Sequence, residues 1–305
     1  MSPVAKGMGA IKTSKRERSE VVASTSRGVD DAAEILAPTL TDEQFAAFTG
    51  LAEEWTGVRL GPHKRAMLLA RIGMRLRRLR LSSVSAYLKY LTSAQGKAEE
   101  KEHFIDVVTT HHTSFFREQD HFSVLSKDVL GSYGKSSDIS VLSAACSTGE
   151  EVWTIGMTLA HTLGNLRFKL TGTDISQRAL QTARRAVYPE ETVSTVPEPL
   201  RNKWLMRSRE RDQRLVRVVP ELRERATFFR VNLTNADGLG LAKYDVIFLR
   251  NVLIYFEREA QRRILGRLLS HVNSRGWLFV GLSETADGFD LPIRRVAHSV
   301  YRRTS

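Results

Sequence analysis

The stretch from Asp138 to Glu151 contains a short apolar run, then a turn that ends in glycine, and then two adjacent carboxylates, Glu150 and Glu151. The run over 139–142 is apolar and β-branched, which predicts a buried strand, and the small residues over 143–149 predict a tight turn. A helical period resumes over 152–161. A strand, turn and helix in this order let the backbone approach a ligand at the carboxyl end of the strand, where open α/β sheets bind small molecules. The alternative is an ordinary βαβ turn with a solvated pair of glutamates.

A second predicted strand, 168–173, ends in Asp174, which lies 24 residues after Glu150. An acid at the end of the second strand is placed to accept hydrogen bonds from ribose hydroxyls. The turn lacks G-x-G-x-x-G, and a helix that opens with Glu150 and Glu151 would repel a pyrophosphate. S-adenosylmethionine fits better, because it carries a sulfonium and an ammonium. The alternatives are a helix cap for Asp174 and a solvated first-turn position for Glu150.

A β-sheet would place these residues side by side at the ends of neighbouring strands, and the sequence predicts such a sheet. Strands are expected over 139–142, 168–173, 227–231, 245–249 and 277–282. Helices are expected between them, notably over 177–186 and 259–273. This alternation predicts an α/β fold with a doubly wound, mostly parallel, Rossmann-like sheet. Four prolines and the alternation Leu215-Val216-Arg217-Val218-Val219 predict an inserted β lobe over about 188–225.

The front of the chain shows helical rather than strand periodicity. Thr41 can cap a helix that carries Phe45, Phe48, Leu51 and Trp55 at helical spacing. Further helices are expected over 63–80, 83–92 and 101–109. We therefore expect a disordered tail over 1–37, a small all-helical domain over 38–108, and the sheet domain over 109–305.

Charge and cysteine content limit the possible functions. The 305 residues carry a formal net charge of +12, which favours an acidic partner. Eight Arg or Lys residues and no Asp or Glu lie over 59–80, so one basic recognition surface is expected. The single cysteine, Cys146, excludes an internal disulfide, and no spacing resembles H-E-x-x-H, so no metal site is expected. No apolar run approaches the roughly 20 residues that span a bilayer, and we expect a cytoplasmic protein without membrane insertion.

Four stretches resemble, in order and spacing, the chemotaxis receptor methyltransferases, bacterial enzymes that esterify glutamate side chains of chemoreceptors. They are 109–118 (TTHHTSFFRE), 144–151 (AACSTGEE), 231–233 (VNL) and 248–256 (FLRNVLIYF). The helical front domain with its entry Gly61-Pro62-His63-Lys64-Arg65 matches as well. The resemblance covers about Leu40 to Arg303.

This resemblance implies S-adenosylmethionine as cofactor, S-adenosylhomocysteine as product, and a methyltransferase domain over 109–305 preceded by a substrate-recognition domain. The cofactor-binding positions of the family correspond here to His111, Thr113, Arg117, Glu150, Asp174, Asn232, Leu233, Arg250 and Asn251. Glu150 would face the methionine ammonium, and backbone amides at Asn232 and Leu233 would read the adenine edge. Capping or loop roles are the alternative for Arg250 and Asn251.

Two positions depart from the family pattern. His111 stands where the family usually has Asn; an imidazole can still donate one hydrogen bond, but its charge varies near neutral pH. Val152-Trp153-Thr154 replaces Pro-Tyr-Ser, so the helix begins without its preferred proline, which affects packing more than chemistry.

A glutamate carboxylate has a reference pKa near ~4.3 and is an anion at neutral pH, so its methylation requires no general base. The enzyme would align and desolvate this nucleophile. The resemblance places Arg117 and Tyr255 at the sulfur end of the cofactor, and we expect both to be catalytic. The alternatives are a structural ion pair of Arg117 with Glu118 or a neighbouring residue, and a core position of the Tyr255 ring with a solvated hydroxyl.

The predicted helix over 63–80 carries a basic stripe of Lys64, Arg71, Arg75 and Arg78 beside an apolar face. By the resemblance, this stripe would recognise the acidic helical bundle of a chemoreceptor. A solvated charged face is the alternative.

The leading interpretation is thus a protein-glutamate O-methyltransferase that acts as a monomer on chemoreceptor cytoplasmic helices, with no nucleic acid expected. A methyltransferase for nucleic acid or a small molecule is one alternative, although no aromatic-interleaved basic strand accompanies the basic helix. A non-catalytic sensor that only binds the cofactor is the other.

Overall fold

A computed structural model describes residues 39–133, 138–235 and 242–304, so the tail expected over 1–37 lies outside the described residues. The described chain begins with helices. They are α1 (Asp42–Thr56), the 3-10 turn η1 (Pro62–Lys64), α2 (Arg65–Leu79), α3 (Val84–Thr92), α4 (Ala94–Glu99) and α5 (Lys101–Val108). The four helices expected from the sequence are confirmed to within a few residues, and α4 was not expected.

Local signals explain where α1 begins and ends. The side chains of Thr41 and Gln44 form a reciprocal capping box at its start, and Gly57 ends it with φ at 74°. Its apolar face packs into an aromatic core, in which the ring of Phe48 lies 6.0 Å from that of Tyr87 and 5.8 Å from that of Phe104. The bundle therefore has a hydrophobic core of its own.

The second part contains a seven-stranded sheet in the order β6-β2-β1-β7-β8-β10-β9. Its strands are β1 (Ile139–Ala144), β2 (Phe168–Asp174), β6 (Ala226–Arg230), β7 (Tyr244–Leu249), β8 (Val272–Val280), β9 (Ile293–Ala297) and β10 (Val300–Arg303). Neighbouring strands from β6 to β8 are parallel, whereas β10 is antiparallel to both β8 and β9. The predicted doubly wound, mostly parallel sheet is confirmed.

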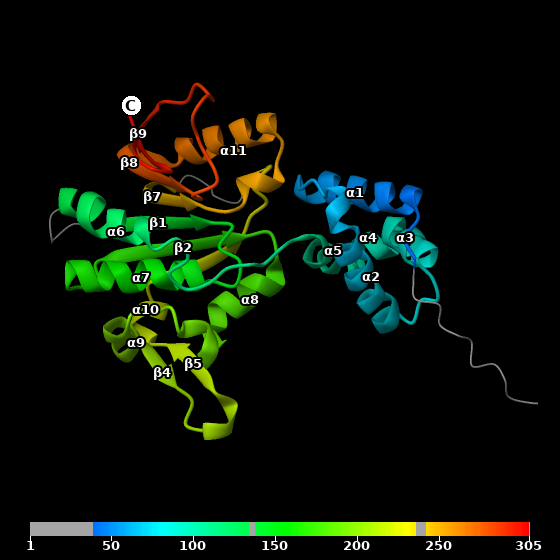
Figure 1. The fold of residues 1–305 in the computed structure, drawn as a ribbon, viewed down its shortest axis with the longest axis horizontal. Coiled ribbons are helices and arrows are strands. Elements are labelled where there is room, and N and C mark those ends of the chain that lie inside the picture. Colours follow the sequence, from blue (N-terminus) through cyan, green and yellow to red (C-terminus); the bar gives the residue numbers. More distant parts are fainter. Residues whose placement is uncertain (1–38, 134–137, 236–241, 305) are drawn as a thin grey trace, which may run out of the picture. The chain divides into compact units, whose positions relative to one another are not determined.

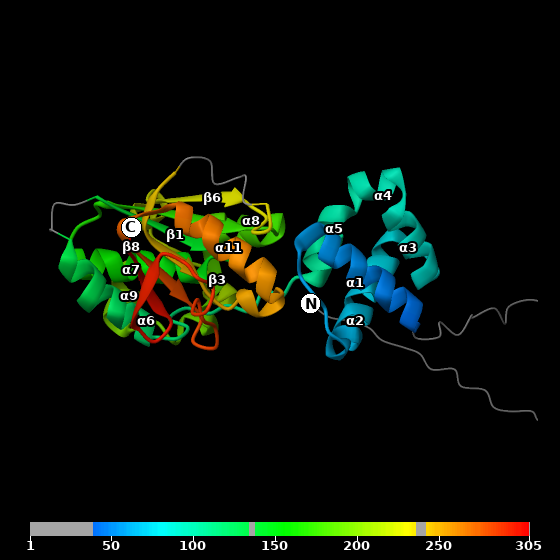
Figure 2. The same ribbon diagram turned by 90° about the horizontal axis from the view of Figure 1, so that it is seen from above.

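Helices cover both faces of this sheet (Figure 1). They are α6 (Asp120–Val124), the π-helical turn η2 (Leu125–Val129), η3 (Leu130–Ser132), α7 (Glu150–Leu163), α8 (Gln177–Arg185), α10 (Pro220–Arg223), η7 (Leu253–Tyr255) and α11 (Arg258–Ser270). Alternate residues of β1 point to opposite faces: Val141 packs with α7, and Leu142 packs with α11. Figure 2 shows β6 and α8 at the same edge of the sheet.

A small antiparallel sheet in the order β3-β5-β4 is inserted between α8 and β6. Its elements are β3 (Val187–Pro189), η4 (Glu190–Val193), α9 (Glu198–Trp204), β4 (Leu205–Arg207), η5 (Arg211–Gln213) and β5 (Leu215–Val218). The alternation of apolar residues around Val216 and Val218 thus does form a β ribbon. The exact boundaries of the three expected parts of the chain stay predictions.

Two features of the sheet were not expected from the sequence. The hairpin of β9 and β10 completes the sheet, although β9 has little apolar alternation. The helix expected over 259–273 ends at Ser270, and β8 begins at Val272. Val272 is fully buried beside Tyr244 of β7, so strand pairing takes precedence over helical periodicity here.

Candidate active site

The carboxyl ends of β1, β2 and β7 meet at one edge of the sheet, where the strand order reverses between β1 and β7. Open α/β sheets bind ligands at such a reversal. A cavity of about 350 Å³ lies here. Its walls come from the turns after these strands, from residues 108–117, and from residues 56–64 of the helical part.

The turn after β1 is built from unusual backbone conformations. Ala145 and Ser147 are left-handed with φ at 60° and 51°, and Gly149 has φ at 96°. A Cβ on Gly149 would lie 2.7 Å from the Cβ of Ala183, so only glycine lets α7 begin this close to α8. Five non-glycine residues with positive φ line or adjoin the cavity: Phe116, Glu118, Ala145, Ser147 and Asn251. Left-handed non-glycine residues cluster at functional sites, because they cost about 1 kcal/mol or more each.

Asp174 lies at the end of β2 and on the cavity wall, with 8% of its surface exposed. Its carboxylate accepts the backbone N–H of Ser147 at 2.8 Å through Oδ2 and that of Ser176 at 2.9 Å through Oδ1. Burial raises the pKa of Asp174, although these backbone bonds and His111 oppose the rise. Ser176, rather than Asp174, caps α8 through a bond from the amide of Ala179. The helix-cap alternative for Asp174 is therefore wrong.

His111 and Thr113 also line the cavity. The Nε2 atom of His111 lies 3.0 Å from Oγ1 of Thr109. Burial lowers the pKa of His111, while the negative charge of Asp174 opposes that shift. Near neutral pH the imidazole is therefore uncharged, and one of its nitrogens can donate a hydrogen bond, as the amide of an asparagine does.

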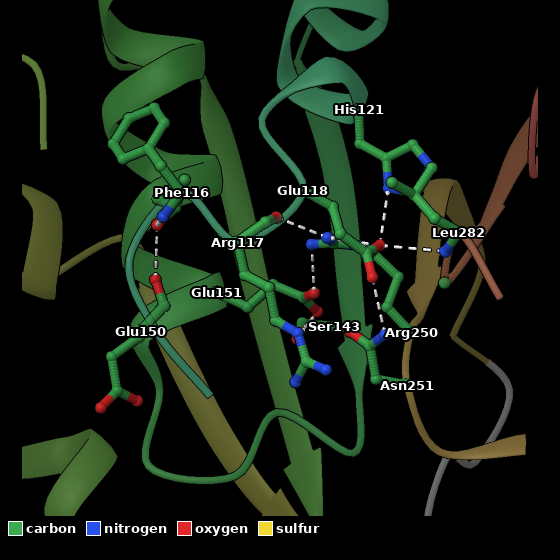
Figure 3. Close-up of polar contacts among 12 residues, drawn as sticks. Phe116, Arg117, Glu118, His121, Ser143, Glu150, Glu151, Arg250, Asn251 and Leu282 are labelled. Carbon is green, nitrogen blue, oxygen red and sulfur yellow. Dashed lines mark hydrogen bonds and ion pairs between the residues drawn. The ribbon is translucent and has the colours of Figure 1, made fainter. Parts of the chain in front are cut away.

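A buried network joins the segment at Arg117 to the ends of β1 and β7 (Figure 3). The Arg250 guanidinium donates to Glu151 and Glu118, each at 2.9 Å, and to the carbonyl of Arg117 at 2.5 Å. The Asn251 amide donates to Glu118 at 2.8 Å. Burial alone would raise the pKa of Glu118, but the bonds from Asn251 and Arg250 lower it below its ordinary value. Glu118 is thus an anion that pairs with Arg250, and the alternative ion pair with Arg117 does not form.

The side chain of Arg117 is left available to the cavity. Its guanidinium makes one hydrogen bond to the residues that the structure describes, through Nη1 to the carbonyl of His112 at 2.7 Å, and it lines the cavity. Tyr255 lies in η7 and lines the cavity as well, and its carbonyl accepts the N–H of Arg59 at 3.0 Å. The structure therefore brings both residues that we expect to be catalytic to one cavity.

The two glutamates at the start of α7 lie differently. Glu151 lines the cavity and accepts hydrogen bonds from Ser143 at 2.7 Å and from Arg250. Glu150 does not line the cavity; it accepts the Thr148 hydroxyl at 2.6 Å, and Figure 3 shows its carboxylate pointing away from Glu151 and Arg250. Burial raises the pKa of Glu150. The geometry therefore favours Glu151 over Glu150 as the acid that faces a cationic ligand.

Asn232 and Leu233 follow β6 and line the cavity. The Asn232 side chain donates to the carbonyl of Trp55 at 3.1 Å and accepts the amide of Thr234 at 3.0 Å. The protein thus occupies the Asn232 oxygen and one of its two amide N–H groups, which favours the backbone of this segment as the part that meets a ligand. Val231, Leu233 and Phe256 add apolar wall next to it.

The basic stripe of α2 is corrected by the structure. Arg75 forms two hydrogen bonds of 2.7 Å with Glu100, whose side chain is 2% exposed, and Glu100 also accepts the hydroxyl of Tyr87. Arg71 donates to the carbonyls of Val107 and Thr109 at the end of α5, each at 2.7 Å. These two arginines thus stabilise the helical bundle. The helix α2 contains no Asp or Glu, and Glu100, 25 residues after Arg75, supplies the acid that pairs with it.

Only part of the basic segment is therefore free to meet a partner. Arg59 pairs with Glu53 and Glu257, and Arg65 pairs with Asp42. Among the described residues, no hydrogen bond or ion pair engages the side chains of Lys64, Arg77, Arg78 or Arg80. Lys64 lines the cavity, and Arg78 is exposed.

Four residues of the site were missed by sequence reasoning: Ser147, Glu118, Glu151 and Glu284. The first three lie within the quoted motifs, where neighbouring residues were chosen instead. Glu284 lies four residues after the end of the apolar strand β8, whereas Asp174 is the last residue of β2, so an acid that follows a buried strand was the signal that could have found Glu284.

The residues present fit S-adenosylmethionine. The hydroxyl of Ser147 is buried on the cavity wall and has no hydrogen-bond partner among the described residues, which a ligand could supply. The carboxylates of Asp174 and Glu151 suit ribose hydroxyls and an ammonium, respectively. Within the same residues, no group of three or more His, Cys, Asp or Glu could hold a metal ion. No described helix is long and apolar enough to cross a bilayer.

Comparison with known proteins agrees with this geometry. Residues 111–301 match the family model described as CheR methyltransferase, SAM binding domain, and residues 43–109 match CheR methyltransferase, all-alpha domain. The chain is 34% identical to Chemotaxis protein methyltransferase 2 of Pseudomonas aeruginosa, over 86% of this chain and 93% of that protein. It is 37% identical to the Chemotaxis protein methyltransferase of Escherichia coli, over 80% of this chain and 85% of that protein. The chain belongs to the CheR family of S-adenosylmethionine-dependent methyltransferases.

Proposed function

We propose that this chain transfers a methyl group from S-adenosylmethionine to glutamate side chains of chemoreceptor cytoplasmic helices, forming glutamate methyl esters. One observation carries the proposal: Arg117 and Tyr255 share a cavity wall with Asp174 and Glu151 at the strand reversal of the sheet. The names of the relatives, chemotaxis protein methyltransferases, support a chemoreceptor as substrate.

When bound, S-adenosylmethionine supplies a methyl group on a positively charged sulfur. The protein's task is then to align and desolvate the incoming carboxylate. The remaining guanidinium donors of Arg117 can hold that carboxylate through two parallel hydrogen bonds. The Tyr255 hydroxyl can orient its attacking oxygen. No residue has to remove a proton, because the nucleophile is already an anion.

The other site residues would bind the cofactor. We assign Asp174 to the ribose hydroxyls, since each carboxylate oxygen accepts one backbone amide and retains another lone pair. We assign Glu151 to the methionine ammonium, and His111 and Thr113 to its amino-acid end. Arg250 and Asn251 would contribute indirectly, because their hydrogen bonds hold Glu151 and Glu118 in position.

Receptor-containing membranes incubated with the protein and methyl-labelled cofactor test the proposal. Methyl esters hydrolyse in alkali and release methanol, whereas methylated amines and bases do not. We expect alkali-labile, volatile label on the receptor. Alkali-stable label, label on nucleic acid, or cofactor binding without transfer would each contradict the proposed function.

A further inference from the structure

The carboxylate of Glu284 is buried just after β8, with 8% of its residue surface exposed. It has no partner of opposite charge among the described residues. Instead, Oε2 accepts the backbone N–H of Gly281 at 2.7 Å and that of Asn251 at 2.8 Å, and Oε1 accepts the backbone N–H of Ile254 at 3.3 Å. Burial raises the pKa of this carboxyl, while these amide bonds oppose the rise.

Two of these bonds, from Asn251 and Ile254, join the turn after β7 to the turn after β8, and the third, from Gly281, lies within the turn after β8. Asn251 and Ile254 belong to the turn after β7, whereas Gly281 and Glu284 belong to the turn after β8. Asn251 is left-handed with φ at 57°, a conformation that asparagine adopts more readily than most residues, and its backbone N–H is bound by Glu284 in this conformation. The bonds to Asn251 and Ile254 hold the stretch that leads directly into Tyr255.

The two turns approach each other closely at Gly281. A Cβ there would lie 2.7 Å from Oε2 of Glu284, 2.8 Å from Nδ2 of Asn251 and 2.9 Å from its backbone nitrogen. Glycine is therefore needed at this position, because the carboxylate sits directly between the two turns.

The same turn is connected to Arg117. The Asn251 side chain donates to Glu118, which follows Arg117 in the chain, and Glu118 also accepts the N–H of Leu282 at 3.1 Å. Two carboxylates, Glu118 and Glu284, thus connect Asn251 to the turn after β8. The residues before Tyr255 and after Arg117 are held by one network.

We propose that Glu284 is a positioning residue for methyl transfer: its carboxylate fixes the turn from Asn251 to Ile254 and thereby places Tyr255 in the cavity that Arg117 also lines. This inference rests on the proposed function. Glu284 is not among the residues that line the cavity, so it acts on the reacting geometry through the turn and not by touching the cofactor.

Glu284→Gln tests this directly. A glutamine amide turns one acceptor into a donor that faces a backbone N–H, so at least one of the three bonds is lost. We expect turnover of receptor at saturating cofactor to fall 10- to 100-fold, while the dissociation constant of S-adenosylhomocysteine stays within threefold. Exposed Glu259, which pairs with Arg262 on α11, provides the matched control, and Glu259→Gln should leave both quantities unchanged.

Gly281→Ala disturbs the same contact without altering Glu284 and should give the same separation of turnover from affinity. Hydrogen exchange gives a readout independent of the substrate: the amides of Gly281, Asn251 and Ile254 should exchange at least tenfold faster in Glu284→Gln. Normal turnover in folded Glu284→Gln, or failure of both variants to fold, would overturn the positioning role. If wild-type protein does not methylate receptor, the proposed function fails. Unchanged hydrogen exchange at the three amides of Glu284→Gln would instead refute only the positioning role of Glu284.

Discussion

Asp174 has a double role at the residue scale, because it offers lone pairs to the cavity while it binds the amides of Ser147 and Ser176. We predict that Asp174→Asn weakens S-adenosylhomocysteine binding about tenfold to a hundredfold, which corresponds to the loss of about 1.5 to 3 kcal/mol of charge-assisted hydrogen bonding. Asp174→Ala should also lower the melting temperature, since it leaves two buried amides unpaired. Calorimetric titration and thermal unfolding measure both effects; unchanged affinity in folded Asp174→Asn would refute the ribose assignment.

Adjacent Glu150 and Glu151 allow a matched pair of substitutions with identical chemistry. We predict that Glu151→Gln weakens cofactor binding at least tenfold, because Glu151 lines the cavity, and that Glu150→Gln changes it less than threefold. Titration calorimetry of the two variants decides between them. The opposite order would restore Glu150 as the ammonium ligand.

At the scale of elements, the basic residues of α2 fall into two groups: some bind other parts of the helical bundle, and the others are exposed to solvent. Arg75 pairs with buried Glu100, and removing one partner of a buried pair leaves the other charge without compensation. We predict that Arg75→Ala lowers the free energy of unfolding by about 3 to 5 kcal/mol. Urea unfolding measures it. A loss below about 1 kcal/mol would show that Glu100 finds water or another partner.

The remaining cations of α2 and its entry are the ones that can meet an acidic receptor. We predict that Arg77→Glu with Arg78→Glu lowers receptor methylation at least tenfold at low salt, with cofactor affinity unchanged, because both side chains are exposed and neither lines the cavity. Wild-type methylation should itself fall as salt rises, because exposed charge interactions are screened.

Exposed Lys89 on α3 and Lys97 on α4 supply the control, since Lys89→Glu with Lys97→Glu changes the charge of the same bundle equally. Equal activity of the two double variants would show that net charge, and not this surface, matters.

At the scale of the whole molecule, His121 links stability to pH. Its side chain is 1% exposed and lies edge-on to the ring of Phe279. This burial lowers the pKa of His121 from 6.5 to about 4. The folded state therefore favours the neutral imidazole, so this contribution to stability is complete above pH 6.5 and is lost as pH falls toward 4.

We predict that wild-type protein loses on the order of 2 kcal/mol more than His121→Phe between pH 7 and pH 5, measured by urea unfolding. The comparison with the variant is needed because other buried acids also titrate. The pKa of Glu118 is lowered, so Glu118, like His121, destabilises the fold as pH falls. The pKa values of Asp174 and Glu284 are raised, so these two acids stabilise the fold as pH falls. Parallel pH profiles for the two proteins would refute the assignment.

The sequence by itself determined the elements whose periodicity is strong and whose neighbours are local. The strands over 139–142 and 168–173, the glycine turn after the first of them, and the acid at the end of the second could be predicted, because each depends on a few adjacent residues. Weaker patterns could not be assigned: β9 is mostly exposed, and only its pairing with β10 makes it a strand.

Tertiary structure alone decided which charges are free and which acid faces the cavity. Glu100 and Arg75 are 25 residues apart, and Glu118 and Arg250 are 132 apart, so no local pattern reveals that they pair. Glu150 and Glu151 differ by one position on a helix, which is about 100° of rotation, and only the packing of α7 on the sheet fixes which one points inward. Side-chain direction and long-range pairing are properties of the folded chain, whereas residue type and period belong to the sequence.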